Sequence, residues 1–424
     1  MSFFKKIKDL KNTKFKFSLP KKNKIVFYDS FIFNDSGQKF LDPYIKSTEI
    51  TNLDIRFKEI YFFILIKAIL KNGFKKDVIL NYTLEFISYV KPNLVLSFLD
   101  SDIKFYTLKK NFTNIKFVIF QTGYRSINNV DLFSKLKTSI NESLSADFVL
   151  AFGRGVANEY ERYIKCKAIP IGSFKNNCFS SKKVLKNFNN IKDIYFISQF
   201  RSNIMSGNRI KGFIEGIPRK IFYEPESILL PKLQKKCLEK GYRLNILGCS
   251  IDVEEEYKFF KEILPNKEFT HLKLTDSASY QDMNKLKNIK SNKVDLIRSL
   301  KDGGIGSYIK LNYADIVFFI DSTLGYEALS LGHRCASFHC RETSFKNSDI
   351  LGNAGFGWPS IQKNQNGNFW TNLQDEKEAD RIIDYILNVS EEDWSKDLNL
   401  VSDVMSYDDG NKKFKEILNS IGVT

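Results

Sequence analysis

DIVFFIDSTLGYEALSLGHRCASF, residues 315–338, holds two strand patterns on either side of a helical one. The run Ile316–Ile320 is continuously apolar, as expected for a strand buried on both faces, and Arg334–Phe338 predicts a second strand. The first strand ends in Asp321, and Ser322 or Thr323 is a natural N-cap for a helix. Strand, helix and strand in this order indicate α/β architecture with a parallel sheet.

The same alternation extends from this segment along the rest of the chain. Further strands are predicted at Lys24–Tyr28, Leu94–Leu99, Lys116–Phe120, Asp147–Phe152, Ala168–Ile171, Asp193–Ser198 and Arg243–Leu247. Helices are predicted at Ile55–Asn72, Thr83–Val90, Val156–Ile164, Glu226–Lys240, Lys293–Leu300, Glu376–Asn388 and Asn411–Ile421. We therefore predict an α/β fold in which two Rossmann-type parallel-sheet domains face a central cleft.

The length of the chain fits this division into domains. It has 424 residues, of which 43% are hydrophobic, and this suffices for two cores of ordinary size. The predicted regions are a basic N-terminal arm (1–24), an N-terminal Rossmann-like domain (25–180), a C-terminal Rossmann-like domain (190–345), and loops and helices that pack back across both domains (346–424). The polar stretch Phe174–Asn190 predicts the linker between the domains.

A formal net charge of +16 makes the protein basic. Such a surface can attract nucleic acid, anionic lipid or a phosphorylated substrate, while a codon bias toward lysine explains the charge equally well. Lysines are most concentrated in residues 1–24, where phenylalanines and leucines are interleaved with them. This arm either lies on an anionic membrane surface or extends into solvent.

The beginning of the chain lacks the continuous apolar core and the small-residue cleavage site of a signal peptide. The most apolar window, Ile60–Leu70, is too short to span a bilayer and contains Lys67. We therefore expect a cytoplasmic protein, with a peripheral position on the inner face of the inner membrane as the alternative. The scattered cysteines and three histidines lack the spacing of a metal site, so no metal is expected.

The most informative chemistry lies where the strand of the opening segment meets its helix. Free backbone N–H groups and the helix dipole at Ser322 and Thr323 point toward the expected cleft, which suits a phosphate. Asp321 precedes this turn, and Gly325 allows close approach of a ligand or a strand. Glu327 lies one turn into the helix and could accept hydrogen bonds from a ribose diol. The alternative is an ordinary capped helix of the core.

The segment Asp321–Phe338 resembles the donor-binding strand, loop and helix of bacterial surface carbohydrate biosynthesis proteins, relatives of capsule, Kdo-type and CDP-alditol polymer transferases. Phe120–Arg125 (FQTGYR) is similar to the Gln-x-Gly-x-Arg loop of that family, and Pro170–Asn177 (PIGSFKNN) is similar to the end of its N-terminal domain. Pro225–Cys237 and Leu244–Gly248 complete the series.

The resemblance implies a GT-B fold, in which the C-terminal domain holds an activated sugar nucleotide and the N-terminal domain binds the acceptor. Such enzymes need no metal, because the helix dipole and basic side chains stabilise the leaving phosphate. The expected partners are a nucleotide-sugar donor and a glycan or lipid-linked acceptor. No cofactor is expected beyond the nucleotide sugar, which is a co-substrate.

An inverting transferase needs a carboxylate or a histidine that takes the proton of the acceptor hydroxyl. Asp100 and Asp102 follow the predicted strand Leu94–Leu99 and are the candidates for this base. Asp29, after the first predicted strand, is a further candidate. The structural alternative is that Asp100 or Asp102 caps the next helix.

Other candidates for the acceptor side of the cleft also follow strands. They are Gln121, Gly123, Arg125, Gly153 and Arg154. Arg125 could clamp a phosphate or a carboxylate through two hydrogen bonds, or form a structural salt bridge instead. Gly153 and Arg154 belong to a short Gly-Arg-Gly turn that opens a helix.

In the C-terminal domain, Gln199, Arg201 and His339 follow strands and are candidates for donor binding. Surface exposure is the alternative for Gln199 and Arg201. His339 could contact the donor or act as an acid, and a purely structural histidine is the alternative. The loop Lys301–Ser307 predicts either a lid or a plain surface loop.

Several functions remain open from the sequence. We expect glycosyl transfer from a nucleotide-activated sugar, such as CMP-linked Kdo or a nonulosonic acid. One alternative is transfer of an alditol phosphate from a CDP donor, although the sequence lacks the widely spaced histidine pair expected for it. Another is a sugar-nucleotide epimerase. The non-enzymatic alternative is a basic nucleic-acid-binding protein, but the lysines are diffuse and no binding motif accompanies them, so nucleic acid is not an expected partner.

Overall fold

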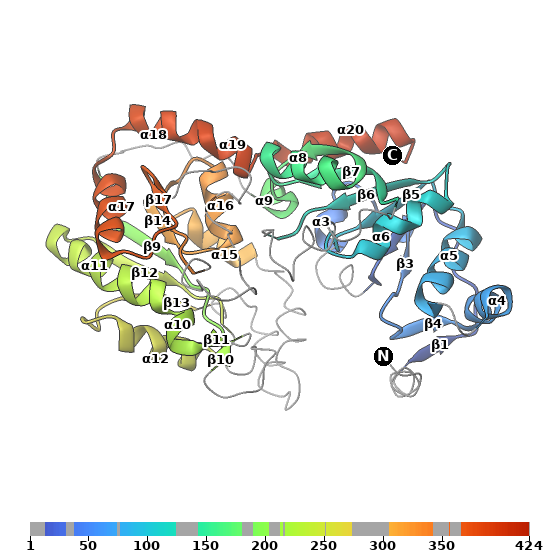
Figure 1. Ribbon diagram of the computed structural model, residues 1–424, viewed down its shortest axis with the longest axis horizontal. Helices are drawn as coiled ribbons and strands as arrows, with labels where there is room; N and C mark the ends of the chain where they lie inside the picture. The colour runs from blue at the N-terminus through green and yellow to red at the C-terminus, as the bar shows by residue number, and fades with distance from the viewer. Residues whose placement is uncertain are drawn as a thin grey trace.

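The computed structural model describes residues 13–30, 38–73, 77–123, 143–179, 190–202, 213–214, 217–250, 252–273, 305–341, 356 and 366–423. These residues form two α/β units that lie side by side (Figure 1). The N-terminal unit is on the right of that view, in blue to green, and the C-terminal unit is on the left. The predictions for 1–12, for Arg125, for the helix 293–300 and for most of the loop 301–307 fall outside the described residues.

The N-terminal unit is built on six parallel strands in the order β3-β2-β5-β6-β7-β8. Their bounds are β2 Ile25–Tyr28, β3 Ile50–Leu53, β5 Leu94–Ser97, β6 Lys116–Phe120, β7 Ser145–Ala151 and β8 Lys165–Pro170. Every residue of β2 and β5 is buried. This burial on both faces explains why their sequences are continuously apolar and do not alternate.

Helices cover both faces of this sheet. Val26 and Tyr28 face a core layer that includes α4 (Phe62–Asn72), α5 (Val78–Val90), α6 (Ile103–Leu108) and α8 (Arg154–Tyr163). Ile25 and Phe27 face the other layer, which includes α3 (Gln38–Leu41), α9 (Phe174–Phe179) and the last helix, α20 (Lys412–Ile421). The C-terminal end of the chain therefore completes the core of the N-terminal unit.

The C-terminal unit is built on seven strands in the order β13-β12-β9-β14-β15-β17-β16. Their bounds are β9 Asp193–Ile197, β12 Arg243–Leu247, β13 Thr270–Leu272, β14 Ile316–Phe319, β15 Arg334–Phe338, β16 Asn366–Gly367 and β17 Trp370–Thr371. All pairs are parallel except β16 with β17. The helices of this unit are α10 (Arg219–Phe222), α11 (Glu224–Lys240), α12 (Val253–Ile263), α15 (Ile305–Leu311), α16 (Thr323–Ser330) and α17 (Glu376–Asn388).

Smaller elements complete the described structure. β1 (Lys14–Lys16) pairs in parallel with β4 (Glu59–Tyr61), and β10 (Phe213–Ile214) pairs with β11 (Ile217–Pro218). Short 3-10 helices lie at Ser47–Glu49, Lys109–Asn111, Leu398–Leu400 and Asp409–Asn411. Across the part of the chain that the structure describes, no helix combines the length and the hydrophobicity needed to cross a membrane.

The C-terminal segment returns from the second unit to the first along the top of Figure 1, through α18 (Glu391–Asp397), α19 (Val401–Val404) and α20. The backbone N–H of Ser406 donates to the carbonyl of Phe152 at 2.7 Å. Gly172 forms an isolated bridge with Tyr407 and has a φ of +81°. A Cβ on Gly172 would lie 1.9 Å from the Ser406 carbonyl oxygen, so the crossing is possible because this residue has no side chain.

The structure confirms the predicted α/β fold with two Rossmann-type, GT-B-like domains. Three strands begin and end at the residues predicted for them: β6 (Lys116–Phe120), β12 (Arg243–Leu247) and β15 (Arg334–Phe338). The helix predicted over Ile55–Asn72 is wrong in its first part, since that part contains β4, which pairs with β1. The second sheet also continues past the predicted boundary at residue 345, because β17 pairs with β15.

The predicted linker Phe174–Asn190 is also partly wrong. Its first six residues form α9, whose Asn176 and Asn177 are buried. Asn177 donates from its side-chain amide to the Ile171 carbonyl (2.8 Å) and to the side-chain oxygen of Asn411 (2.9 Å). Asn177 therefore satisfies backbone and side-chain groups at the crossing of the C-terminal segment, although its type makes this stretch resemble a solvated linker.

Candidate functional site

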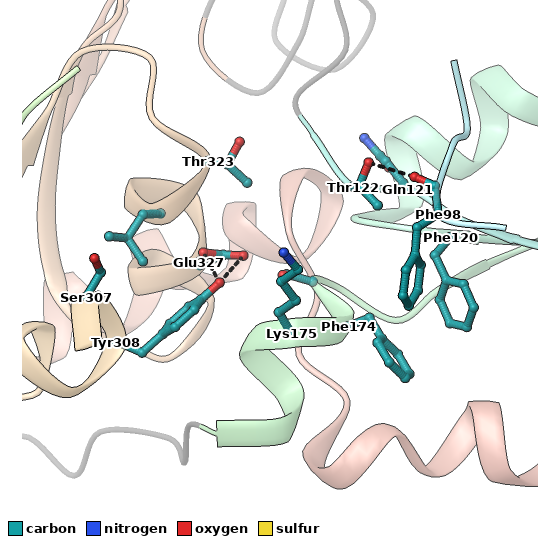
Figure 2. Close-up of a pocket in the computed structure, with 12 residues that line it drawn as sticks. Phe98, Phe120, Gln121, Thr122, Phe174, Lys175, Ser307, Tyr308, Thr323 and Glu327 are labelled. Atoms are coloured by element: carbon teal, nitrogen blue, oxygen red, sulfur yellow. Dashed lines mark hydrogen bonds between the residues drawn. The ribbon is translucent and has the colours of Figure 1, made fainter. Parts of the chain in front are cut away.

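A cavity of about 310 Å³ lies between the two sheets, where ligands bind in open parallel α/β folds. Its lining comes from the ends of β5 and β6 in the first unit, from α9, and from α15 and α16 in the second unit. The lining residues are Phe98, Phe120, Gln121, Thr122, Ser173, Phe174, Lys175, Ser307, Tyr308, Thr323, Leu324 and Glu327. Figure 2 shows the two groups of side chains on opposite sides, with Lys175 between them.

The first turn of α16 opens into this cavity. Ser322 is in the N-cap position and has extended backbone angles, but its side chain makes no capping hydrogen bond. Thr323 and Leu324 begin the helix and line the cavity. The N–H groups of a first helical turn have no partner within the helix, and the helix dipole places partial positive charge there. This end of α16 is therefore suited to bind an anion.

Gly325 holds α16 close to the strand that precedes it. A Cβ at this position would lie 2.2 Å from the ring of Phe319 in β14. Of the two roles predicted for Gly325, the structure therefore supports close packing of helix on strand. The close packing fixes the position of the first turn relative to the end of β14.

Glu327 lies on the cavity wall one turn further along α16, and only 4% of it is exposed. The hydroxyl of Tyr308 donates to both of its carboxylate oxygens, at 3.0 Å each (Figure 2). Burial raises the pKa of Glu327 to about 7, although hydrogen bonds from Ser173 and Tyr308 and the positive charge of Lys175 act in the opposite direction. Its charge therefore changes near neutral pH.

Three residues around Glu327 are not predicted from the sequence: Ser173, Lys175 and Tyr308. Ser173 and Lys175 lie within Pro170–Asn177, which resembles a family pattern but indicates no chemical role by itself. Figure 2 shows the Lys175 side chain directed toward Glu327 from α9. The cluster thus joins residues of both units around one buried carboxyl group.

Aromatic rings form the opposite wall of the cavity. The ring centroids of Phe98 and Phe120 are 4.7 Å apart, and those of Phe120 and Phe174 are 4.6 Å apart. Gln121 also lines this wall, but its side chain is held by Gly123 and Phe152: its amide donates to the Gly123 carbonyl at 3.0 Å, and its oxygen accepts from the Phe152 N–H at 2.8 Å. The first unit therefore offers a largely apolar, preformed surface to the cavity.

Asp100 and Asp102, the predicted bases, do not line the cavity. Asp100 is fully buried: Oδ2 accepts from the Tyr160 hydroxyl at 2.7 Å, and Oδ1 accepts from the hydroxyl and the N–H of Thr122 at 3.2 and 3.3 Å. Asp102 accepts from the Lys104 N–H at 3.1 Å as the N-cap of α6, and from the Tyr28 hydroxyl at 2.7 Å. Asp102 therefore caps α6, as in the structural alternative, while Asp100 belongs to a buried hydrogen-bond network.

Asp29 likewise has a structural partner. It is fully buried and has a φ of +78°. Its Oδ1 accepts from Arg56 Nε at 3.2 Å and its Oδ2 accepts from Arg56 Nη2 at 2.6 Å, which is a bidentate ion pair.

Gly153 and Arg154 meet the C-terminal segment. A Cβ on Gly153 would lie 2.3 Å from the Asp403 carbonyl oxygen, and the Arg154 guanidinium lies 3.9 Å from the Asp403 carboxylate. Neither residue lines the cavity. The glycine after β7 therefore permits the close crossing of α19 over α8.

Asp321 and His339 are also placed beside the cavity and not on its wall. Arg341 donates from Nε to Asp321 at 3.1 Å and also contacts the carboxylate of Glu226, and both Arg341 and Glu226 are buried. His339 is fully buried, its Nδ1 lies 3.2 Å from the Tyr326 hydroxyl, and burial lowers its pKa to about 4. A neutral, enclosed imidazole supports the structural alternative for His339.

Gln199 and Arg201 follow β9, as predicted, and do not line the cavity. The side chain of Arg201 is exposed, while its backbone N–H donates to the Tyr223 hydroxyl at 2.7 Å. Of the predicted site residues within the described chain, the structure therefore brings Gln121, Thr323 and Glu327 together around one cavity.

A known protein family matches a large part of the chain. Its profile, described as "putative O-antigen biosynthesis protein", matches residues 118–303 and 287–421. The two matches together extend over more than half of the chain. No curated protein matches it.

Distant likenesses to solved structures extend along almost the whole chain. A glycosyltransferase from Rickettsia africae has 14% identity and a TM-score of 0.47, with 97% of this chain and 99% of that one covered. S. aureus MnaA, solved with UDP, has 12% identity and a TM-score of 0.46, with 95% and 98% covered. The wall teichoic acid polymerase TagF has 12% identity and a TM-score of 0.44, with 99% and 92% covered.

Proposed function

Because the chain belongs to the family of O-antigen biosynthesis proteins, we propose that it transfers a sugar from a nucleotide-activated donor to a surface polysaccharide or a lipid-linked acceptor. In this reaction a hydroxyl oxygen of the acceptor attacks the anomeric carbon of the donor sugar. The bond from that carbon to the phosphate oxygen breaks, and the nucleotide leaves with the electron pair.

The observation that supports this proposal is the cavity between the sheets, in which the first turn of α16 and the carboxyl group of Glu327 lie on one wall. The leaving phosphate would accept hydrogen bonds from the N–H groups of Thr323 and Leu324. One helical turn away, Glu327 would accept hydrogen bonds from the ribose hydroxyls. One helical turn rises about 5.4 Å, and the adjacent phosphate and ribose of a single nucleotide would span this interval.

Charge stabilisation in this cavity would come from the protein itself. The dipole of α16 and the ammonium group of Lys175 would act on the negative charge that develops on the leaving phosphate. We therefore propose a metal-independent reaction in which the nucleotide sugar is a co-substrate and no further cofactor takes part.

The first unit would bind the acceptor. Its aromatic wall of Phe98, Phe120 and Phe174 suits the apolar face of a sugar ring or of a lipid-linked glycan. The assignment of Asp100 or Asp102 as the base that receives the acceptor proton stays a prediction. Within the donor class, a CMP-linked acidic sugar such as Kdo or a nonulosonic acid is the finer proposal, and we place the reaction in the cytoplasm.

Isothermal titration with CMP, CDP, UDP, GDP and dTDP, followed by product mass spectrometry with the matching donor, tests the proposal. We expect one nucleotide to bind and its sugar to appear on an acceptor glycan, with the nucleotide released. Release of CMP with transfer of an alditol phosphate would instead identify a phosphotransferase. Isomerisation of the donor without an acceptor would identify an epimerase, and no binding of any nucleotide would contradict all three.

The pKa of Glu327 gives this binding a defined pH dependence. Ionised Glu327 accepts hydrogen bonds from ribose, and a carboxyl group with a pKa of about 7 is mostly protonated at pH 6 and mostly ionised at pH 8. We expect the affinity for a nucleoside to rise about tenfold over this interval. The affinity is measured for the nucleoside because it has no phosphate group. Protonation of a phosphate on the ligand therefore cannot contribute to the change. The variant Glu327→Gln should lose the pH step, and an unchanged step in that variant would show that another group is responsible.

A further inference from the structure

Several large hydrophobic side chains are exposed on the N-terminal unit, in a part of the chain that does not line the cavity. Within the residues that the structure describes, six of them lie between positions 15 and 70: Phe15 (37% exposed), Phe17 (66%), Leu19 (50%), Phe63 (52%), Ile66 (38%) and Leu70 (81%). We call these six residues the α4 surface. An exposed apolar patch of this kind marks an interaction site more often than an accident of sequence.

The helix α4 presents its apolar side to solvent. Phe63, Ile66 and Leu70 are spaced by three and four residues, so they form one stripe along the helix. Ile64 and Ala68 lie on another side of α4 and are buried in the core of the unit. A helix that packs on a core normally turns polar residues outward, and α4 has hydrophobic residues on both sides.

The segment around β1 extends this apolar stripe. The rings of Phe15 and Phe17 lie 6.3 and 5.2 Å from the ring of Phe62, measured between centroids. Phe62 is the first residue of α4, so these contacts join the two parts of the α4 surface. Figure 1 shows β1, β4 and α4 together at the edge of the N-terminal unit.

Lysines accompany the apolar residues. On α4, the exposed Lys67 and Lys71 share one carboxylate, that of Glu85, at 3.0 Å each. On β1, Lys14 and Lys16 share the carboxylate of Glu59. Each pair of lysines thus keeps one net positive charge, and the exposed Lys21, Lys22 and Lys24 follow in the same stretch of chain. The α4 surface is therefore apolar and basic at once.

We propose that the α4 surface docks on an anionic phospholipid bilayer. Phenylalanine and leucine side chains would enter the boundary between headgroups and acyl chains, and the lysines would reach the lipid phosphates with their ammonium groups. A lipid surface is favoured over a protein partner because the cores of protein interfaces are depleted in lysine, whereas membrane-surface helices combine lysines with large apolar residues. This inference does not depend on the identity of the nucleotide donor.

Sedimentation with vesicles tests the docking surface on the full chain. The vesicles are phosphatidylcholine alone and an equal mixture of phosphatidylcholine with phosphatidylglycerol. The wild type should bind the anionic vesicles preferentially. The variant Phe63→Gln/Leu70→Gln should bind them at least about tenfold more weakly, and the variant Lys67→Gln/Lys71→Gln about fivefold more weakly. The matched control is Leu238→Gln/Leu400→Gln, which removes two exposed leucines from the other unit and should bind like the wild type.

Melting temperatures accompany these measurements. Lys67 and Lys71 pair with the buried carboxylate of Glu85, to which the amides of the introduced glutamines can still donate, so their variant should remain folded even if the apolar variant does not. Absence of wild-type binding to anionic vesicles would overturn the proposal, as would wild-type binding by both α4 variants. Light scattering that shows a dimer in the wild type and a monomer in the apolar variant would overturn it as well, because the α4 surface would then be a contact between two copies of the chain.

Discussion

The variant Glu327→Ala is expected to bind its nucleotide about 100-fold more weakly than the wild type at pH 8, because hydrogen bonds from two ribose hydroxyls to a carboxylate are lost. Glu327 lines the cavity, and both of its carboxylate oxygens already accept from Tyr308, so the group is held in position before any ligand arrives. Transfer activity should fall by at least the same factor. Isothermal titration and product mass spectrometry measure the two effects.

Stability measurements separate this loss of binding from a loss of folding. The pKa of Glu327 is raised from its ordinary value to about 7, mainly by burial, so the unfolded chain gives up this proton at lower pH than the folded chain does. This group therefore reduces stability progressively as pH rises from about 4.5 to about 7. The isosteric variant Glu327→Gln removes that penalty and should melt no lower than the wild type at pH 8.

A matched surface variant provides the remaining control. Glu376 has a largely exposed side chain, pairs with Lys232 of α11 and does not line the cavity. The variant Glu376→Ala should leave nucleotide binding unchanged. If Glu327→Ala, with its melting temperature preserved, bound the nucleotide as tightly as the wild type did, the assignment of the ribose to Glu327 would be wrong.

The variant Gly172→Ala is expected to lower the free energy of unfolding by about 3 kcal/mol, from backbone strain and overpacking together. Gly172 has a φ of +81°, and the alanine Cβ would stand 1.9 Å from the Ser406 carbonyl oxygen, which is backbone and cannot rotate away. The C-terminal segment would have to shift away from the first unit. Denaturant unfolding measures the loss, and limited proteolysis after residue 400 reports the displaced segment.

Gly241 offers a control with the same backbone conformation and no close neighbour. It has a φ of +69° as the C-cap of α11, and a Cβ there would meet nothing within 4 Å. The variant Gly241→Ala should therefore cost only about 1 kcal/mol, from the left-handed conformation alone. Equal losses in the two variants would show that the crossing of the C-terminal segment at Gly172 does not constrain the fold.

Much of the fold could be predicted from the sequence, because strands buried on both faces are continuously apolar. Lys116–Phe120 and Arg243–Leu247 show this directly, since both have the predicted bounds. The strand β3, Ile50–Leu53, is not predicted, because its four residues include a threonine and an asparagine and give no continuous apolar run. Pairing with the buried β2 determines that strand, and pairing is a tertiary contact.

The candidate site could be predicted only where it depends on local sequence. The strand end, helix start and carboxylate of residues 321–327 lie in one short segment, so their relation is visible in the sequence. Ser173 and Tyr308 are more than a hundred residues apart in the chain, and the fold brings both to one cavity. No residue spacing in the sequence therefore predicts that they line the same site. Asp100 is a candidate base because it follows a strand, and sequence position cannot reveal that Tyr160 and Thr122 occupy both of its carboxylate oxygens.

The central claim is that a nucleotide occupies the cavity between the two units with its phosphate at the first turn of α16. Structure determination of the complex with the tightest-binding nucleotide tests it most directly. We predict that phosphate oxygens accept hydrogen bonds from the N–H groups of Thr323 and Leu324, and that the ribose hydroxyls donate to Glu327. A nucleotide bound elsewhere on the protein, with this cavity free of it, would contradict the claim.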